Sequence, residues 1–269
     1  PDLLSGKKIG AFGLTEPNAG TDASAQQTTA VLDGDEWVLN GNKIFITNAG
    51  HAHVYVIFAM TDKSLKNKGI SAFIVEEGTP GFEVGKKELK LGIRGSATAE
   101  LIFSDCRIPK ANLLGKVGGG FAIAMKTLDG GRIGIASQAL GIAQGALDET
   151  VKYTMERKQF GKSISQFQNT QFQMADLKTK VEASRLLVRS AAFKKDCKEP
   201  YSADAAMAKL FAAETAMEVT TKAVQFHGGY GYTREYPVER MMRDAKITEI
   251  YEGTSEVQRM VIAASMFKK

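Results

Sequence analysis

The spacing of apolar residues changes near residue 115, and this change constrains the fold more than any other feature of the chain. From Lys8 to about Leu114, apolar residues form short or alternating runs separated by turn-forming residues, a pattern typical of strands. Beyond Gly120 they recur about every 3.6 residues, which is typical of amphipathic helices. We therefore expect an antiparallel β-barrel or β-sandwich domain over residues 1–115, followed by an antiparallel four-helix bundle over residues 116–269.

Asn40-Gly41 lies between two apolar runs of the first domain, and both residues tolerate positive φ. The sequence therefore predicts a β-hairpin turn at this dipeptide. The clearest strands predicted nearby are Glu36–Leu39, Val54–Met60, Ser71–Val75 and Glu100–Phe103.

Four helices are expected in the second domain. Leu128 would begin the first helix, the third would run from about Ser202 to Val224, and Ser255 with Gln258 resembles a capping box at the start of the last. Apolar stripes mark the first two helices: Ala136, Leu140, Ala143, Leu147 and Val151, then Met174, Leu177, Val181, Ser184 and Val188.

Composition argues against several classes of protein. No apolar run approaches the length of a membrane span, and the net charge of +5 is spread along the chain rather than gathered in a block. That distribution fits phosphate-bearing small molecules better than nucleic acid, so we expect neither a DNA nor an RNA partner. Cys106 and Cys197 lie far apart, which favours a reducing compartment and argues against a disulfide framework. No His, Cys or carboxylate spacing indicates a metal site.

Two familiar nucleotide-binding motifs are excluded. Gly161-Lys162-Ser163 resembles the end of a P-loop, but Glu156 stands where the first glycine is required. Neither Gly118–Gly120 nor Gly130-Gly131 completes the glycine pattern of a Rossmann site.

Glu252 stands between Tyr251 and Gly253, just before the last predicted helix. A carboxylate held at such a corner beside apolar groups can be desolvated, which raises its pKa toward the range of a general base for a C–H bond. A solvated loop glutamate is the simpler alternative.

Several motifs stand in one order along the chain: Leu14–Asp22, Asn40–Asn48, Glu156–Lys162, Gln225–Tyr232 and Ile250–Thr254. Together they resemble the acyl-CoA dehydrogenase family, most closely its short-chain, butyryl-CoA type, and the resemblance runs from about Phe12 to the C-terminus. Members of that family begin with a helical domain that has no counterpart here. We therefore expect this chain to be the middle and C-terminal part of a longer enzyme.

The resemblance implies FAD as the cofactor. Thr15, Thr21, Phe45 and Thr47 stand where the family contacts the flavin ring, although many relatives have Trp in place of Phe45. Without the family, the two threonines would be turn residues and Phe45 a core aromatic. The full set of expected FAD contacts is Phe12, Leu14, Thr15, Thr21, Phe45, Thr47, Arg157, Phe160, Gln168, Gln225, Gly229, Thr254 and Glu256.

Arg157 is implied to bind the pyrophosphate of an FAD held mainly by a neighbouring subunit. The planar guanidinium suits phosphate oxygens, whereas the simpler reading is a cation at the C-terminal end of a helix. Completion of each site by a second chain implies a homo-oligomer, expected to be a homotetramer built as a dimer of dimers.

Substrate contacts are implied at Thr21, Asp129, Arg132, Tyr251 and Gly253, although Asp129 and Arg132 could equally form a local charge arrangement on the helix. Some relatives carry their catalytic carboxylate at or near the position of Gly131. Here that residue is glycine, which leaves Glu252 as the implied base.

The implied reaction is α,β-dehydrogenation of a short-chain acyl-CoA, of the butyryl-CoA to crotonyl-CoA type, in fatty acid metabolism. Glu252 would remove the Cα proton while hydride passes from Cβ to flavin N5, with electron-transferring flavoprotein as acceptor. An acyl-CoA oxidase and a catalytically silent flavin-binding scaffold are the alternatives. We expect a bacterial cytoplasmic protein, with the mitochondrial matrix as the other possibility. Arg243 and Asp244 are expected to anchor the Glu252 segment by charge pairing, and His227 to be structural.

Overall fold

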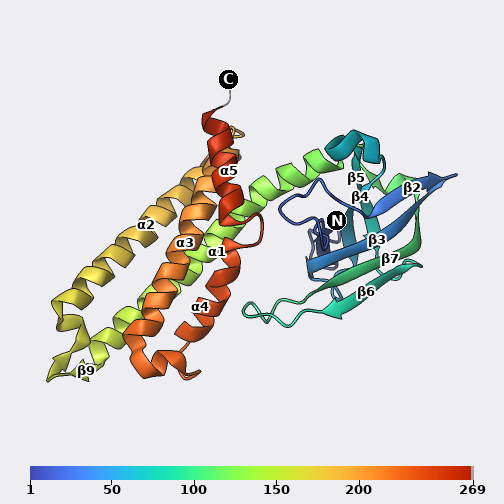
Figure 1. The fold of residues 1–269 in the computed structure, drawn as a ribbon. Coiled ribbons are helices and arrows are strands. Elements are labelled where there is room, and N and C mark those ends of the chain that lie inside the picture. Colours follow the sequence, from blue (N-terminus) through green and yellow to red (C-terminus); the bar gives the residue numbers. More distant parts are fainter. Residues whose placement is uncertain (268–269) are drawn as a thin grey trace. The chain divides into compact units, whose positions relative to one another are not determined.

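The structure is a computed structural model that describes residues 1–267. Its chain forms two compact units. The first contains Pro1–Lys90 and Arg94–Thr127, and the second contains Leu91–Ile93 and the chain from Leu128 onward. The predicted fold class, a β domain before a helical domain, is confirmed (Figure 1).

The first unit is built on an eight-stranded sheet with the order β6-β7-β3-β2-β4-β5-β8, in which β1 pairs with β4. Most neighbours are antiparallel, as expected, but β1 is parallel to β4, and Thr29 of β2 also pairs in parallel with Met60 of β4. The strands are β1 (Gly10–Gly13), β2 (Thr29–Asp33), β3 (Glu36–Thr47), β4 (Val54–Met60), β5 (Ile70–Glu76), β6 (Phe82–Lys87), β7 (Thr98–Pro109) and β8 (Leu113–Leu114), with 3₁₀ helices η1 (Lys63–Gly69) and η2 (Lys110–Asn112).

The prediction of a hairpin turn at Asn40-Gly41 was wrong. Strand β3 runs straight through this dipeptide, and the turn lies earlier, where Asp33 pairs with Glu36. Asn40 instead bonds across to Asp105 of β7, accepting from its N–H at 2.8 Å. Gly41 has a φ of 137°, and an added Cβ would lie 2.7 Å from the Cα of Thr28. The two residues therefore form an irregularity within a long strand, because long-range pairing with β7 outweighs the local turn preference.

Within residues 1–267, the second unit contains five α-helices, one more than expected. They are α1 (Gly120–Glu156, whose first turns belong to the first unit), α2 (Gln168–Asp196), α3 (Ser202–His227), α4 (Val238–Lys246) and α5 (Ser255–Met266). Short strands β9 (Lys158–Gln159) and β10 (Lys162–Ser163) and 3₁₀ helices η3 (Ile164–Gln166), η4 (Gly228–Tyr232) and η5 (Ile247–Glu249) connect them.

Helix α1 begins at Gly120, earlier than the predicted start at Leu128. A Cβ at Gly120 would lie 2.5 Å from the backbone carbon of Ser71, so only glycine fits where this helix begins against β5. The helix also continues through Gly130 and Gly131. Packing thus overrides the low helix propensity of these glycines.

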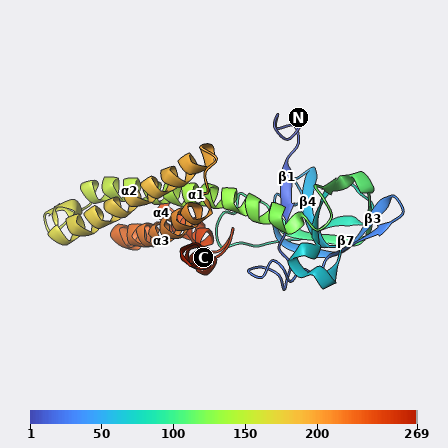
Figure 2. The ribbon, with the colours of Figure 1, turned by 90° about the horizontal axis from the view of Figure 1, so that it is seen from above.

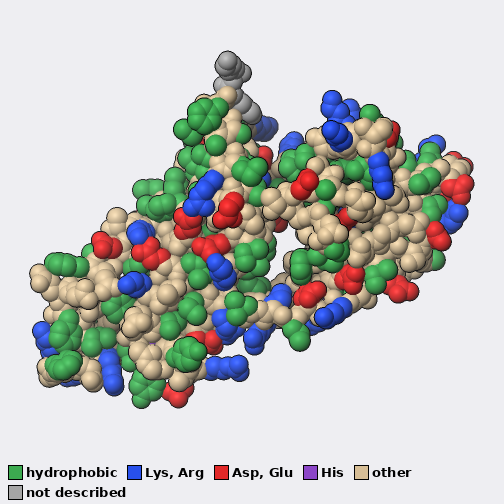
Figure 3. All heavy atoms as spheres, in the orientation of Figure 1, with side chains coloured by type: hydrophobic (Ala, Val, Ile, Leu, Met, Phe, Trp, Pro, Cys, Tyr) green, Lys and Arg blue, Asp and Glu red, His purple; other side chains and the backbone are tan. Residues whose placement is uncertain are grey.

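Alanines dominate the core between α1, α2 and α3, which run side by side in the helical unit (Figure 2). Ala139 and Ala143 of α1 and Ala212 and Ala216 of α3 are fully buried. Figure 3 shows hydrophobic side chains among the charged ones on the surface of this unit, and Phe172 and Phe193 of α2 are exposed. Within residues 1–267, every helix is too short or too polar to cross a membrane.

Candidate active site

Glu252 lies in a turn between η5 and α5 that adopts an unusual backbone conformation. Its φ is 56° and that of Gly253 is 87°, so two successive residues occupy the left-handed region. This region is unfavourable for a glutamate and persists only when surrounding contacts enforce it. The side-chain amide of Gln258 donates to the carbonyls of Glu252 (3.2 Å) and Gly253 (2.8 Å), and Lys209 Nζ donates to the Gly253 carbonyl at 2.7 Å. The turn is therefore fixed from both α5 and α3.

The predicted capping box at Ser255 was wrong by one residue. Thr254 is the N-cap of α5, and its hydroxyl accepts from the N–H of Val257 at 3.3 Å. Ser255 is already helical, and Gln258 is used to hold the Glu252 turn. The hydroxyl that faces the helix end thus belongs to Thr254, a distinction that neighbouring Thr and Ser cannot reveal by type alone.

The Glu252 carboxylate lies against α1 at Gly131. A Cβ built on Gly131 would lie 2.5 Å from Oε2 of Glu252, closer than any ordinary contact. Glycine at residue 131 therefore leaves the space that the carboxylate occupies.

Burial raises the pKa of Glu252, and the positive charges of Arg132 and Lys209 oppose that increase. The side chain is only half-buried. Glu252 is thus a carboxylate whose proton affinity is increased but which two cations keep available in its basic form. Such a group can act as a general base toward a weakly acidic proton.

Arg132 is held firmly beside this carboxylate. It is 5% exposed, and its Nη1 bonds to Oδ1 of Asp129 at 2.6 Å, where Ser202 also donates its hydroxyl at 2.9 Å. Its Nε is buried without a hydrogen-bond partner among residues 1–267. Nearby, the Tyr251 hydroxyl donates to Oε1 of Gln138, which ties the Glu252 turn to α1. The structure therefore brings together Asp129, Arg132, Tyr251, Glu252 and Gly253, all of which the sequence singled out.

Arg157 lines a cavity of about 510 Å³ in the helical unit. Its guanidinium carbon is 6.0 Å from the centre of the Tyr230 ring. The lining residues are Tyr153, Arg157, Gln159, Ile164, Phe226, His227, Gly228, Gly229, Tyr230, Thr233 and Glu235. Arg157 and Gly229 of the expected FAD set thus meet at one cavity, whereas Phe160, Gln168 and Gln225 are exposed residues outside its lining.

His227 packs into the wall of this cavity. It is 2% exposed and stacks on Tyr153 with ring centres 4.2 Å apart, and its Nδ1 bonds to the carbonyl of Ala223. Burial lowers its pKa. These contacts support the structural role expected for it. Within residues 1–267, no group of three or more His, Cys, Asp or Glu side chains is placed to hold a metal ion.

In the β unit, Phe45 is 60% exposed and has a φ of 57°, so it is not a core aromatic. It lies at an irregularity of β3, next to Ile44, whose N–H donates to the Thr15 carbonyl at 2.9 Å. Of the remaining expected contacts, Phe12 and Thr15 are half-buried, Leu14 is buried, Thr21, Thr47 and Glu256 are exposed, and Thr254 is half-buried. An exposed aromatic in strained backbone fits a ligand-contacting position.

Comparison with known proteins identifies the family. Residues 11–106 match the acyl-CoA dehydrogenase middle domain, and residues 118–267 match the acyl-CoA dehydrogenase C-terminal domain. The chain belongs to the acyl-CoA dehydrogenase family. A short-chain specific acyl-CoA dehydrogenase of Clostridium acetobutylicum is 64% identical over 266 residues, which are 99% of this chain and 70% of that protein.

Solved structures of the family have the same fold. Butyryl-CoA dehydrogenase from Megasphaera elsdenii is 59% identical, with a TM-score of 0.98 over 99% of this chain and 70% of its own. A chain of the structure described as the electron transferring flavoprotein of Acidaminococcus fermentans is 64% identical, with a TM-score of 0.98 over 100% of this chain and 70% of its own. PigA, solved with FAD and proline, is 35% identical, with a TM-score of 0.96 over 98% of this chain and 69% of its own.

The expectation for Arg243 and Asp244 was wrong. Arg243 pairs with Glu239 of its own helix at 2.8 Å and donates to the Leu91 carbonyl, and Asp244 accepts from the N–H of Ile93 at 2.6 Å. The two residues therefore hold the Leu91–Ile93 segment rather than the Glu252 turn. Helix α4, on which they stand, was not predicted, and its position determines what they can reach.

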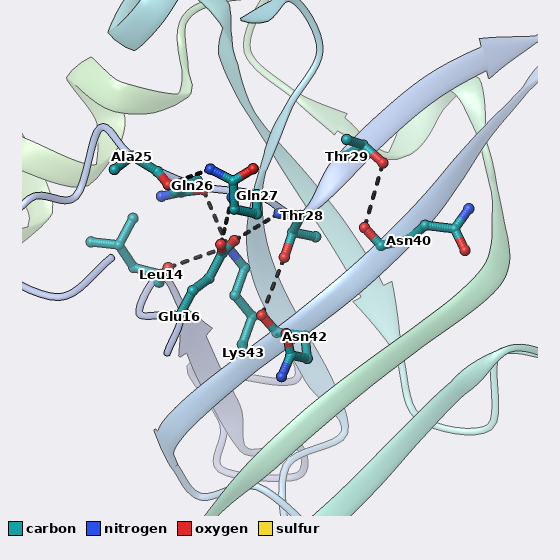
Figure 4. A network of polar contacts seen from close by, with 10 residues as sticks. All are labelled: Leu14, Glu16, Ala25, Gln26, Gln27, Thr28, Thr29, Asn40, Asn42 and Lys43. Atoms are coloured by element: carbon teal, nitrogen blue, oxygen red, sulfur yellow. Dashed lines mark hydrogen bonds and ion pairs between the residues drawn. The ribbon is translucent and has the colours of Figure 1, made fainter. Parts of the chain in front are cut away.

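Two buried lysines of this acyl-CoA dehydrogenase chain were missed by sequence reasoning. Lys209 stands in the alanine-rich face of α3, and this interruption of an apolar stripe was the available signal. Lys43 occupies an inward position of β3 and is 0% exposed. Its ammonium group lies 2.7 Å from Glu16 and 3.1 Å from Gln26, and Figure 4 shows the three side chains converging.

Proposed function

We propose that this chain catalyses the FAD-dependent α,β-dehydrogenation of short-chain acyl-CoA thioesters to trans-2-enoyl-CoA, with Glu252 as the base that removes the Cα proton. The observation that carries the proposal is the half-buried Glu252 carboxylate, whose pKa burial raises and whose backbone is fixed in a left-handed turn. The similarity to short-chain acyl-CoA dehydrogenases supports the substrate class and the reaction.

Glu252 and the residues around it would have different roles in the proposed dehydrogenation. Glu252 accepts the proton on its carboxylate, in the space left by Gly131. Arg132, buried and fixed by Asp129, and Tyr251, tied to Gln138, give the surroundings of the carboxylate a rigid polar frame. Rigid placement matters because a misplacement of about 1 Å costs roughly a hundredfold in rate. The proposed contacts to the acyl-CoA are Thr21, Asp129, Arg132, Tyr251 and Gly253.

The residues present fit FAD. The cavity beside Arg157 combines a guanidinium, which pairs well with phosphate oxygens, with aromatic rings such as Tyr230 and Phe226. Exposed Phe45, with Thr15 and Thr47 on the same β unit, would contact the flavin ring. When bound, FAD supplies the acceptor for the hydride that leaves Cβ.

Partners and location complete the proposal. Electron-transferring flavoprotein is proposed as electron acceptor, supported by the highly similar chain from such a structure. Arg157 stands at an exposed cavity and Phe160 is 92% exposed, which supports completion of the FAD site by a second copy in a dimer of dimers. The bacterial relatives support a cytoplasmic location, with the mitochondrial matrix as the alternative.

Anaerobic addition of butyryl-CoA to the FAD-loaded protein tests the function, with bleaching of the flavin absorbance as the expected result. A protein that binds butyryl-CoA without bleaching would be the silent scaffold instead. Admission of air separates the remaining alternative, since an oxidase would reoxidise rapidly and release hydrogen peroxide. A dehydrogenase would stay reduced until electron-transferring flavoprotein is added.

A further inference from the structure

Lys209 is a fully buried cation in the middle of α3. Ala205, Ala206, Ala208 and Ala212 surround it in sequence and are also fully buried. Burial lowers its pKa to about 8. An ammonium group withdrawn from water is costly unless its environment compensates for the lost hydration.

The compensating contact is with the backbone of the Glu252 turn. Lys209 Nζ donates to the carbonyl of Gly253 at 2.7 Å, and Gln258 donates to the same oxygen at 2.8 Å. One carbonyl thus receives a charged donor from α3 and a neutral donor from α5. Rotation of this peptide group would break both bonds, so they hold Glu252 and Gly253 at positive φ.

Charged groups from four neighbouring segments act on Lys209. Glu249 of η5, Arg132 of α1, Glu252 of the turn and Glu256 of α5 all act on its ammonium group. Burial raises the pKa of Glu252, and the positive charges of Arg132 and Lys209 both oppose this increase. The charge of Lys209 therefore acts on the proposed base as well as on the backbone that carries it.

We propose that Lys209 is a positioning residue for the Cα-proton base: its ammonium group holds the Gly253 carbonyl, fixes the left-handed turn that presents Glu252, and keeps the Glu252 carboxylate ionised. The inference rests on the proposed function and deepens it. Lys209 is proposed to touch neither substrate nor cofactor and to act only through Glu252.

Two variants separate the donor from the charge. Lys209→Met removes both, whereas Gln258→Met removes the neutral donor to the same carbonyl and leaves the charge. Both are expected to slow flavin bleaching by butyryl-CoA, by roughly tenfold to a hundredfold, since both loosen the turn. Only Lys209→Met is expected to move the acid limb of the pH–rate profile to higher pH. This variant alone removes a positive charge that opposes the effect of burial on the pKa of Glu252. Lys209→Arg should restore the wild-type midpoint.

The experiment is rapid anaerobic mixing of each FAD-loaded protein with butyryl-CoA over a series of pH values, with crystal structures of the variants to read φ at Glu252 and Gly253. An unchanged rate in Lys209→Met, or a midpoint that moves equally in the two Met variants, overturns the proposal. If Lys209→Met does not fold, Lys209→Gln gives the same comparison, because it is neutral but keeps a polar end. Failure of the wild-type protein to bleach would refute the proposed function, whereas bleaching that is indifferent to Lys209 would refute only this inference.

Discussion

In the described part of the chain, each of the two units contains one fully buried lysine, and the charges of the two lysines are compensated in different ways. Lys43 of the β unit forms an ion pair with Glu16 at 2.7 Å, and that carboxylate also accepts from the N–H groups of Gln27 and Thr28. Lys209 of the helical unit faces a backbone carbonyl instead. Burial lowers the pKa of each lysine to about 8.

The difference explains why the two neighbouring carboxylates behave oppositely. Burial by itself would raise the pKa of Glu16, but the Lys43 charge and the backbone hydrogen bonds outweigh it and hold that pKa below its usual value. Among residues 1–267, the Glu252 carboxylate has no such hydrogen-bonded ion-pair partner, and its pKa is raised by burial. A fully paired buried carboxylate is stable and unreactive, whereas a partly compensated one remains able to take up a proton.

Replacement of Glu252 is expected to have the largest effect on activity. Glu252→Gln keeps size and hydrogen bonding but removes basicity, so flavin bleaching by butyryl-CoA should fall by at least about 10²- to 10⁴-fold. The variant should still retain FAD and bind the acyl-CoA. Glu214→Gln, at an exposed carboxylate paired with Arg259, is the matched control and should bleach at the wild-type rate. Normal bleaching by Glu252→Gln would remove Glu252 from the mechanism.

The Lys43–Glu16 pair should show its importance in stability rather than chemistry. Lys43→Met leaves a buried unpaired carboxylate, and loss of one partner from such a pair costs about 3–5 kcal/mol. Urea unfolding followed by fluorescence of Trp37 reports this unit, because Trp37 is the single tryptophan and lies in its core. The double variant Lys43→Met with Glu16→Gln should lose less than the sum of the single variants. Arg107→Gln, at an exposed pair with Asp33, should cost much less stability than Lys43→Met, because exposed ion pairs contribute little. Equal losses of stability at Lys43 and Arg107 would contradict this expectation.

Arg157 tests an exposed cation against the two buried ones. Loss of a charged hydrogen bond to phosphate is worth about 1.5–3 kcal/mol, so Arg157→Ala should weaken FAD retention roughly tenfold or more. Subunit association should weaken with it, because each supports the other by mass action. The ratio of flavin to protein absorbance and light scattering after gel filtration measure both. Arg189→Ala, at an exposed arginine of α2, is the control. Full flavin and an unchanged oligomer in Arg157→Ala would exclude its predicted role.

The pH dependence of unfolding of the β unit, followed by Trp37 fluorescence, should show the contribution of the Lys43–Glu16 ion pair to stability. The folded pKa of Glu16 lies below its unfolded value of about 4.5, so its stabilisation is complete above that value and is lost as the pH falls through the folded pKa. The folded pKa of Lys43, about 8, also lies below its unfolded value of 10.5, so stability should rise with pH across that window. Glu16→Gln should flatten the acid limb and Lys43→Met the alkaline one. Limbs that persist unchanged in both variants would assign the dependence to other groups.

The smallest effect is expected at the cap of α5. Thr254→Ala removes the hydroxyl that accepts from Val257, at a cost of about 1 kcal/mol. Ser255→Ala removes a buried hydroxyl without a partner in the described part of the chain, and should cost less. Thermal unfolding of the two variants, read by circular dichroism, should therefore rank Thr254→Ala as the less stable. A lower stability of Ser255→Ala than of Thr254→Ala would support Ser255 as the N-cap, as first predicted.

The sequence predicted those features that depend on local periodicity. The apolar run Val54–Met60 and the stripe through Ala136 and Leu140 are properties of single elements, and the fold class follows from them. The prediction of a turn at Asn40-Gly41 failed because pairing with β7, some sixty residues away in the sequence, determines the backbone conformation of this dipeptide. The start of α1 at Gly120 was not predicted for the same reason, because the close contact with β5 that requires glycine there is formed only in the folded chain.

At the candidate site, residue chemistry and family resemblance indicated Glu252, Arg132 and Tyr251, and the structure brings them together. The two residues that hold the turn were not found. Lys209 interrupts the alanine-rich face of α3, which marks it as unusual but does not reveal that it contacts the Gly253 carbonyl. Gln258 was interpreted as part of a helix cap rather than as a donor to that carbonyl. What a polar side chain contacts is decided by tertiary structure, and no local pattern encodes it.

The close approach of the Glu252 carboxylate to Gly131 also restricts the order in which substitutions can accumulate. Because a Cβ there would lie 2.5 Å from Oε2 of Glu252, even alanine at residue 131 would require the carboxylate to move from its position. A carboxylate could move from the turn to helix α1 only if Glu252 were shortened first or in the same step. The intermediate on that route has no base. Gly131 and Glu252 are therefore expected to change together or remain fixed, although each substitution taken alone alters a single side chain.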